Sequence, residues 1–163
     1  MARAIRLLVL DVDGVLTDGR LYFGARGEAL KAFHVRDGVG LKELQRAGLT
    51  VAVISGRRSR MVAARCRELG VRHVLQGAGD KLAALLQLCA RLKLTPAACA
   101  FVGDDLPDVP LMRAAALSFA VADAHHSARR AADVVTRLPG GRGAVREVCD
   151  HLLALESRRG RAR

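Results

Sequence analysis

The chain has 163 residues, 51% of them hydrophobic and 3% aromatic, and a net charge of +11 at pH 7. This length and composition fit one globular domain and exclude a disordered chain, and no apolar run approaches the length that crosses a bilayer. Because aromatic side chains are few and Trp is absent, we expect neither a stacking platform for nucleic acid nor a membrane partner.

The positive charge is scattered along the sequence and is densest from Arg158 to Arg163. A surface of this kind keeps a protein soluble or attracts anionic molecules. The Cys residues have neither metal-site nor redox-motif spacing, and the first apolar run is too short for a signal peptide. We therefore expect reduced thiols in a cytoplasmic protein.

The first apolar run, Leu7–Leu10, leads directly into Asp11, Asp13 and Gly14. Such a run predicts a buried parallel strand, and Gly14 lets the backbone turn away at its end. Open α/β sheets bind ligands at this carboxyl edge. Neighbouring carboxylates repel each other, and Mg²⁺, which prefers hard oxygen ligands, would relieve the repulsion. The alternative is a strand end with two solvated aspartates.

Two short strands are expected next, over residues 21–23 and 30–35, with a glycine-containing turn between them. This hairpin would project beyond the acidic pair as a flap. A helix over 38–47 should follow. Asp37 either caps that helix or contacts a substrate, and His34 is either a substrate contact or an ordinary strand residue.

The buried run 50–54 predicts a second parallel strand, which ends at Ser55, and a helix should follow over 59–69. Arg57 and Arg65 have the spacing to reach the side of the Ser55 loop. The alternative for such arginines is a solvated basic face.

A third short strand, 73–75, precedes Lys81, which lies in the first turn of a helix expected over 82–92. The helix macrodipole disfavours a cation at this end. A Lys placed there often has an anionic partner, although a solvated Lys is the alternative.

The fourth buried strand, 100–102, precedes the acidic residues Asp104, Asp105 and Asp108, which again favour a metal ion. The remaining chain predicts a helix over 109–114, strands near 117–121 and 133–135, and a final helix over 144–155. Alternating strands and helices predict an α/β fold with a doubly wound parallel sheet and no second domain.

The polar side chains at these strand ends should converge on one edge of the sheet, where they suit phosphoryl transfer through an aspartyl phosphate. One carboxylate would attack phosphorus, Mg²⁺ would screen the charge, and a hydroxyl and an ammonium would hold phosphate oxygens. A second carboxylate would protonate the leaving alcohol and then activate water. The residues available for this chemistry are Asp11, Asp13, Ser55, Lys81, Asp104 and Asp108.

In chain order, DVDGVLTDG from Asp11, Ser55 in VISGR, Lys81 and GDDLPD from Gly103 resemble the four motifs of the haloacid dehalogenase superfamily of phosphatases. The resemblance covers most of the chain. It implies that Asp11 is the nucleophile, Asp13 the general acid/base, and Ser55 and Lys81 the phosphate-binding residues. It also implies Mg²⁺ ligation by the Asp11 and Asp104 side chains and the Asp13 carbonyl, with Asp108 supporting Lys81 or the metal shell.

The segments FHVRDG (33–38), SGR (55–57), FAVADA (119–124) and GGRGAVRE (140–147) are similar to the family of 3-deoxy-D-manno-octulosonate 8-phosphate phosphatases. This family hydrolyses a sugar phosphate that also carries a carboxylate, in lipopolysaccharide precursor synthesis, and Arg and Lys suit both anionic groups. The resemblance implies a substrate site that consists of Asp13, His34, Val35, Arg36, Asp37, Gly38, Arg57, Arg65 and Lys81.

Members of this family lack a cap domain and form tetramers in which a neighbouring subunit helps to close the site. We accordingly expect a capless phosphatase domain over 1–156 and a mobile basic tail over 157–163. The apolar residues of the hairpin are too many for an isolated flap in water, which favours a homotetramer. These hairpin residues are Leu21, Phe23, Leu30 and Phe33. Residues 140–147 could form a second cover, with Arg142 or Arg146 at the bound anion.

Three alternatives to this function are open. A phospho-receiver domain also presents aspartates, a hydroxyl and a Lys, but its phosphorylated Asp lies on a middle strand and it has no acidic cluster after the Lys. A nonulosonate 9-phosphate phosphatase would use the same chemistry on another sugar. A nucleic-acid-binding role rests on charge alone and would require steep salt dependence of binding.

Overall fold

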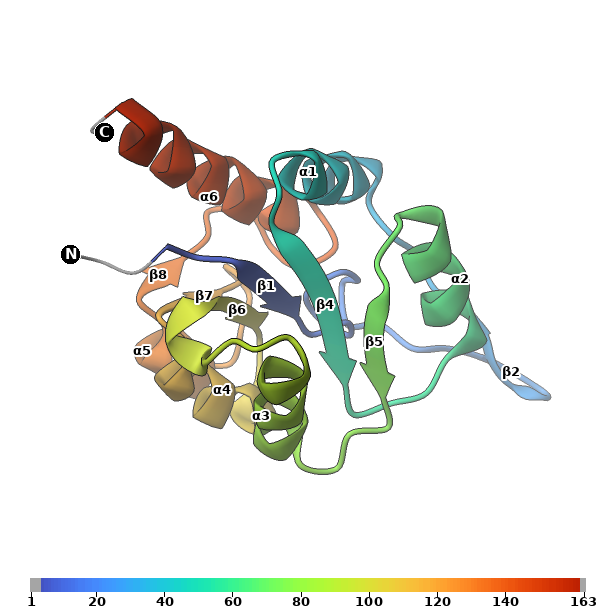
Figure 1. Cartoon of the computed structure of the whole chain (residues 1–163). Helices are drawn as coiled ribbons and strands as arrows, with labels where there is room; N and C mark the ends of the chain where they lie inside the picture. Colours follow the sequence, from blue (N-terminus) through green and yellow to red (C-terminus); the bar gives the residue numbers. More distant parts are fainter. Residues whose placement is uncertain (1–3, 162–163) are drawn as a thin grey trace.

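The structure is a computed structural model that describes residues 4–161. Within these residues, the centre of the fold is a six-stranded parallel sheet with the strand order β5-β4-β1-β6-β7-β8 (Figure 1). The strands are β1 (Leu7–Leu10), β4 (Thr50–Ser55), β5 (His73–Gln76), β6 (Cys99–Gly103), β7 (Leu117–Ala120) and β8 (Val134–Val135). The predicted α/β fold with a doubly wound parallel sheet is confirmed.

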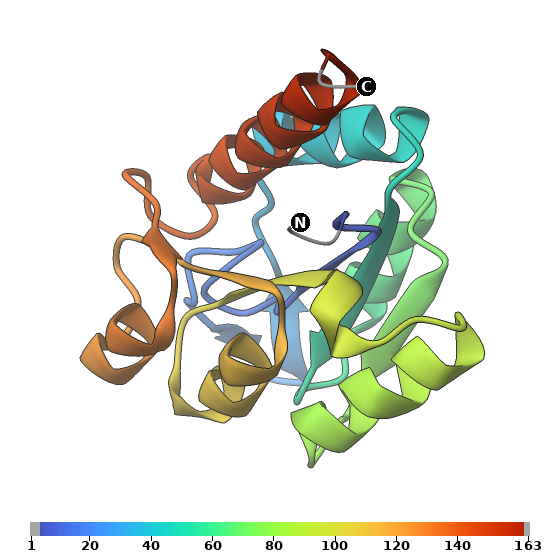
Figure 2. The same ribbon diagram turned by 60° about the vertical axis from the view of Figure 1, so that its left-hand side comes forward.

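Helices cover both faces of the sheet (Figures 1 and 2). One face carries α1 (Val35–Arg46), α2 (Arg60–Glu68) and α6 (Ala144–Arg161), and the other carries α3 (Lys81–Arg91), α4 (Val109–Ala114) and α5 (His126–Ala131). Two short 3₁₀ helices, η1 (Pro96–Ala98) and η2 (Leu106–Asp108), flank β6. The expected helices are present, and α5 is an addition.

Helices α5 and α6 differ from what the sequence predicts. The cap of α5 is His125, whose ring accepts the N–H of Ser127, and an imidazole cap is not an evident start signal in a sequence. Helix α6 continues to Arg161, so most of the expected tail over 157–163 is helical in the structure, while residues 162 and 163 lie outside the described residues.

The middle strand β1 determines where the acidic pair lies. Leu10 lies opposite Val53 of β4 on one side and Val102 of β6 on the other, and all four β1 side chains are fully buried. The chain passes from β1 toward β4 but returns to β6 on the opposite side of β1, so the sheet order reverses there. Asp11 therefore emerges at the topological switch point, where such sheets bind ligands.

The hairpin consists of β2 (Tyr22–Gly24) and β3 (Gly27–Leu30), and its second strand is earlier than the predicted 30–35. The residues after β3 lead into α1, which begins at Val35. The Nδ1 atom of His34 accepts the N–H of Arg36 and caps this helix. Of the two alternatives for Asp37, capping of this helix was therefore wrong, because His34, three residues earlier, takes that position.

Asp37 instead connects helices α1 and α6 through a hydrogen bond. Its side chain is buried between α1 and α6, and its Oδ1 accepts the N–H of Arg146 in the first turn of α6 at 2.9 Å. Burial raises the pKa of Asp37, although the Arg146 N–H acts in the opposite direction. The carboxylate thus supplies an acceptor to a helix N-terminus from a different part of the chain.

The glycine-rich loop before α6 packs against the loop that follows β1. The N–H of Gly141 donates to the carbonyl of Val15 at 2.9 Å, and the N–H of Gly140 donates to Asp123. A Cβ at Gly140 would collide with the carbonyl oxygen of Gly14. This close approach explains the glycine and makes the anchoring of α6 relevant to the acidic loop.

We predict that Asp37→Ala lowers the free energy of unfolding by about 1–3 kcal/mol, because the buried N–H of Arg146 loses its acceptor. Asp37→Asn keeps an acceptor oxygen and removes the buried charge, so its loss should stay below about 1 kcal/mol. Urea denaturation of both variants measures the difference. Equal losses would mean that this hydrogen bond does not hold the two helices together.

Candidate active site

A buried ion cluster lies at the carboxyl edge of the sheet, around Asp11. The Nζ of Lys81 is 3.0 Å from Asp11 Oδ1 and 2.8 Å from Asp108 Oδ1. Lys81 is the first residue of α3, a helix capped by Asp80, whose carboxylate accepts the N–H of Ala83. The sequence prediction that Lys81 has an anionic partner is therefore confirmed, with two carboxylates in place of one.

Asp108 organises the loop after β6. Its side chain is 1% exposed, and its Oδ2 accepts the N–H groups of Asp104 at 2.9 Å and Asp105 at 3.3 Å. The other oxygen faces Lys81. Asp108 thus links the loop that carries Asp104 to the ammonium beside Asp11.

Carboxylate oxygens of Asp11, Asp104 and Asp108 lie within 4.8 Å of one another. Burial, reinforced by Asp108, raises the pKa of Asp11 to about 6, although Lys81 acts to lower it. Burial, reinforced by Asp11 and Asp108, raises the pKa of Asp104 to about 8. A single ammonium does not balance these carboxylates, so Asp11 and Asp104 suit a hard divalent cation such as Mg²⁺.

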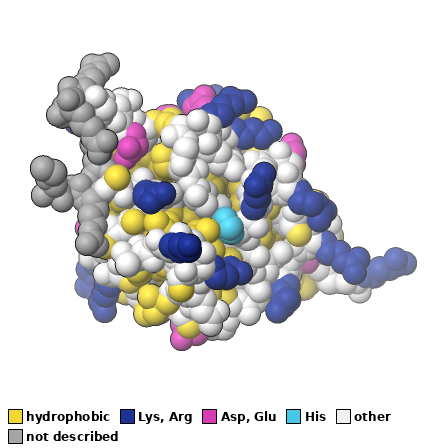
Figure 3. Space-filling view, viewed as in Figure 1, with side chains coloured by type: hydrophobic (Ala, Val, Ile, Leu, Met, Phe, Trp, Pro, Cys, Tyr) yellow, Lys and Arg dark blue, Asp and Glu magenta, His cyan; other side chains and the backbone are white. Residues whose placement is uncertain are grey.

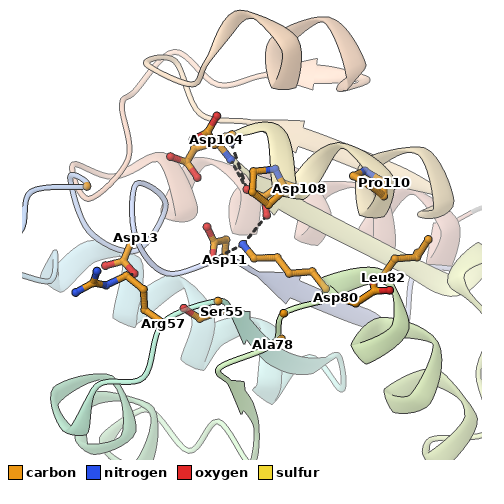
Figure 4. A pocket seen from close by; sticks show the side chains of 16 residues that line it. Asp11, Asp13, Ser55, Arg57, Ala78, Asp80, Leu82, Asp104, Asp108 and Pro110 are labelled. Carbon is orange, nitrogen blue, oxygen red and sulfur yellow. Dashed lines mark hydrogen bonds and ion pairs between the residues drawn. The ribbon is translucent and has the colours of Figure 1, made fainter.

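These residues line an open pocket of about 820 Å³. In Figure 4, Asp13 and Arg57 lie together at one end, Asp11 lies at the centre, and Asp104 and Asp108 approach from the opposite side. Ser55, the last residue of β4, is buried and also lines the pocket. The structure therefore brings together the predicted residues from all four strand ends.

The hairpin adds two residues that sequence analysis missed. The Nζ of Lys31 forms an ion pair with Asp13 and lies 2.9 Å from Glu28 Oε1. Burial opposes the charge of Lys31, but its bonds to Asp13 and Glu28 raise its pKa. The available signal was a Lys within the apolar stretch 30–33, which we interpreted as one side of a flap.

The remaining predicted substrate residues do not line this pocket. His34, Asp37, Gly38 and Arg65 surround a narrow crevice with Phe33, whose ring lies 5.9 Å from the Arg65 guanidinium carbon. Exposed Val35 and Arg36 are in the first turn of α1, beside that crevice. Within one chain, the structure thus separates the predicted substrate residues into two groups.

The two arginines considered for the second cover have different surroundings. Arg142 lines a pocket of about 360 Å³ together with His34. Arg146 pairs with Asp150 at 2.8 Å and with Glu43 at 3.4 Å, between α6 and α1. Figure 3 shows Lys and Arg side chains dispersed over one face of the molecule, with fewer acidic ones.

Within residues 4–161, no helix combines the length and hydropathy that crossing a membrane requires. All four Cys side chains are free and buried, as the sequence predicts.

Comparisons with known proteins show the family of this chain. Residues 24–116 match the family model of haloacid dehalogenase-like hydrolases. The chain is 52% identical to a 3-deoxy-D-manno-octulosonate 8-phosphate phosphatase of Escherichia coli, over 97% of this chain and 85% of that protein.

Solved structures agree with the sequence comparison. The phosphatase of the same name from Moraxella catarrhalis, in complex with magnesium, phosphate and KDO, has a TM-score of 0.90 at 43% identity, over 92% of this chain and 86% of that one. The cobalt-bound deoxy-D-mannose-octulosonate 8-phosphate phosphatase from Haemophilus influenzae also has a TM-score of 0.90, at 44% identity over 92% and 88% of the two chains. The chain therefore belongs to the haloacid dehalogenase-like hydrolases and, within them, to the family of 3-deoxy-D-manno-octulosonate 8-phosphate phosphatases.

Proposed function

We propose that this chain is a Mg²⁺-dependent phosphatase that converts 3-deoxy-D-manno-octulosonate 8-phosphate to the free sugar acid and phosphate, a step of lipopolysaccharide precursor synthesis. The observation that carries the proposal is the position of Asp11, which faces an open pocket with a buried ammonium on one side and a second acidic loop on the other. The similarity to a structure named as holding magnesium, phosphate and KDO supports the substrate.

In the proposed mechanism, a carboxylate oxygen of Asp11 attacks phosphorus and forms an aspartyl phosphate. Lys81 favours the ionised form of Asp11 before attack and stabilises charge on the phosphate oxygens afterwards. The Ser55 hydroxyl donates to one of these oxygens. Asp11, Asp104 and the Asp13 carbonyl would hold Mg²⁺, which would supply charge neutralisation at the phosphoryl group.

Asp13 serves both halves of the reaction. Its carboxyl group protonates the leaving alcohol oxygen, and the resulting carboxylate then removes a proton from the water that attacks the aspartyl phosphate. Asp13 is two residues beyond Asp11, on the part of the loop that curls around the Val12 carbonyl. The side chain consequently lies at the pocket end where Arg57 also points (Figure 4).

The carboxylate end of the substrate needs cations outside the phosphate-binding centre. Arg57 meets this need within the chain, because it lines the pocket and is partly exposed. We propose that the second group, His34 to Gly38 with Arg65, acts on substrate at a boundary between subunits. This arrangement would reconcile the family resemblance with the separation of the two groups within one chain.

The findings above bear differently on two of the alternative functions. A non-enzymatic phospho-receiver is excluded, because the chain belongs to a hydrolase family. Activity on a nonulosonate 9-phosphate uses the same catalytic residues and is decided by the substrate screen described below.

We further propose that the protein is a cytoplasmic homotetramer. Each subunit would consist of the phosphatase domain 1–156 and a short basic extension. The support is the hairpin, where Leu21 is 46%, Phe23 65% and Leu30 49% exposed, whereas Phe33 packs against the core. Contacts between hairpins of neighbouring subunits would bury this apolar surface.

The function is tested by measuring phosphate release from a set of sugar phosphates, with Mg²⁺ or with EDTA. We expect Mg²⁺-dependent turnover that is fastest on 3-deoxy-D-manno-octulosonate 8-phosphate. Asp11→Asn should fold normally and lose at least about 10³-fold in kcat, because an amide cannot attack phosphorus. Faster turnover of a nonulosonate 9-phosphate, or an active Asp11→Asn variant, would contradict the proposal.

Removal of metal should make stability depend on pH. Because the pKa values of Asp11 and Asp104 rise from 3.8 to about 6 and about 8, the metal-free folded state keeps protons that the unfolded state has released. Stability should therefore fall as pH rises from about 4 to about 8. Mg²⁺ should raise Tm more at about pH 8 than at about pH 5. Thermal unfolding of the parent and of Asp104→Asn, with and without Mg²⁺, tests this prediction. The Tm of Asp104→Asn should respond weakly to Mg²⁺. Equal shifts of Tm in the two proteins would contradict the prediction.

Substitution of the exposed hairpin residues should dissociate the assembly. We expect light scattering to give a tetramer for the parent and a smaller species for the double variant Phe23→Ser, Leu30→Ser. Leu86→Ser is the matched control, because Leu86 is 48% exposed on α3, outside the hairpin. A monomeric parent, or a double variant that stays tetrameric, would refute the proposed role of the hairpin.

A further inference from the structure

Lys31 occupies an unusual place for a lysine. It directly follows β3 on a hairpin whose large apolar side chains are exposed, yet its own side chain is only 1% exposed. Lysine is among the residues least often buried, and burial requires a partner. The Lys31 side chain is directed inward, to the pocket rim, and this direction needs an explanation.

Two cations and two carboxylates lie together at this part of the pocket rim. They belong to Lys31, Arg57, Asp13 and Glu28. Lys31 binds Asp13 Oδ1 and lies 2.9 Å from Glu28 Oε1. Arg57 approaches the same two carboxylates from the other side, at 3.8 Å from Asp13 Oδ2 and 3.5 Å from Glu28 Oε1. Each oxygen of the Asp13 carboxylate thus faces its own cation, which restricts rotation of the group.

The two cations do not hold Asp13 equally. Lys31 donates a hydrogen bond to it and is almost inaccessible to solvent, whereas the Arg57 side chain is 43% exposed and lies at the outer limit of an ion pair. Solvent screening weakens the exposed pair far more than the covered one. Glu28 in turn compensates the charge of Lys31, so that the ammonium is retained at this position.

We propose that Lys31 is a positioning residue for Asp13: it holds Oδ1 of the carboxyl group, so that Oδ2, which lies 3.8 Å from Arg57, carries the proton to the leaving oxygen of the substrate. The proposal rests on the proposed function, in which Asp13 is the general acid/base. A general acid must come within hydrogen-bond distance of the atom that it protonates. Misplacement by about 1 Å is enough to cost on the order of 10²-fold in rate.

The position of Lys31 also links the hairpin to catalysis. Glu28 is in β3 and Lys31 follows its last residue, so a displacement of the hairpin moves both partners of the ion pair. The outer side of the same hairpin carries the exposed residues Phe23 and Leu30. Whatever covers that surface therefore also determines how firmly Asp13 is held.

The dependence of the reaction rate on the leaving group distinguishes a positioning role of Lys31 from a general structural role. Release of an alcohol from a sugar phosphate requires a proton from Asp13, whereas 4-nitrophenolate leaves without one. In Lys31→Met, we expect alcohol release in a single turnover of 3-deoxy-D-manno-octulosonate 8-phosphate to slow by about 10–100-fold. The burst of 4-nitrophenolate from 4-nitrophenyl phosphate should change by less than about 3-fold, because the Asp11 attack is retained.

Two further variants complete the experiment. Lys31→Arg keeps the cation and should recover most of the alcohol-release rate, and Lys42→Met, which removes an exposed lysine of α1, should behave as the parent on both esters. Circular dichroism and thermal unfolding establish that each variant is folded. If Lys31→Met is not folded, Lys31→Ala, which also lacks a side-chain donor, takes its place with the same expected pattern.

An equal loss on both esters, or no loss on either, would overturn the positioning role. Failure of Lys31→Arg to exceed Lys31→Met would overturn it as well. The parent enzyme distinguishes this failure from failure of the proposed function. A parent that hydrolyses both esters keeps the phosphatase assignment when the Lys31 role falls, whereas a parent inactive on both overturns the two together.

Discussion

The site depends on one buried ammonium that is shared by two carboxylates. Lys81 is 8% exposed, Asp11 6% and Asp108 1%, and Lys81 lies within 3.0 Å of both carboxylates. Burying these charges has a large desolvation cost, and removal of Lys81 would leave the Asp11 and Asp108 carboxylates uncompensated. The three residues come from the end of β1, the start of α3 and the helix η2. A doubly wound sheet with β1 at its switch point is the arrangement that brings these chain segments together.

Several local features follow from that cluster. Asp108 reaches Lys81 and the N–H of Asp104 at once because η2 folds back beneath the end of β6. A Cβ at Gly103 would lie 2.5 Å from the Cβ of Asp108, so a side chain there would displace the turn. Gly14 has a φ of 86° and lies against Asp104, which explains a glycine in the loop after β1. These glycines are spatial requirements of the acidic loops.

The part of the site that could be predicted from the sequence is the part encoded locally. Buried runs that end in Asp11, Ser55 and Asp104 identify strand ends, and the carboxyl ends of parallel strands share one edge. The ion pair of Lys31 with Asp13 could not be predicted, because it depends on the direction in which the hairpin folds over the rim. That direction is a tertiary property without a signature in residue spacing.

The misplaced start of α1 has a different cause. The cap of α1 was one of two alternatives for Asp37, because Asp is a common cap residue, whereas His34 takes this role and Asp37 lies between helices. Sequence spacing indicated that Arg65 could reach the side of the Ser55 loop, and in the structure the ring of Phe33 lies beside its guanidinium. Both contacts involve segments that are distant in the sequence.

Trapping of the covalent intermediate would identify the residue that attacks phosphorus. The enzyme is mixed with Mg²⁺ and substrate, quenched within the first turnover and reduced with borohydride, which converts an aspartyl phosphate to homoserine, and its peptides are then analysed by mass spectrometry. We expect the conversion at Asp11 and at no other aspartate. Conversion at Asp13 or Asp104, or substrate turnover with no modified aspartate, would contradict the assignment of Asp11 as the residue that attacks phosphorus.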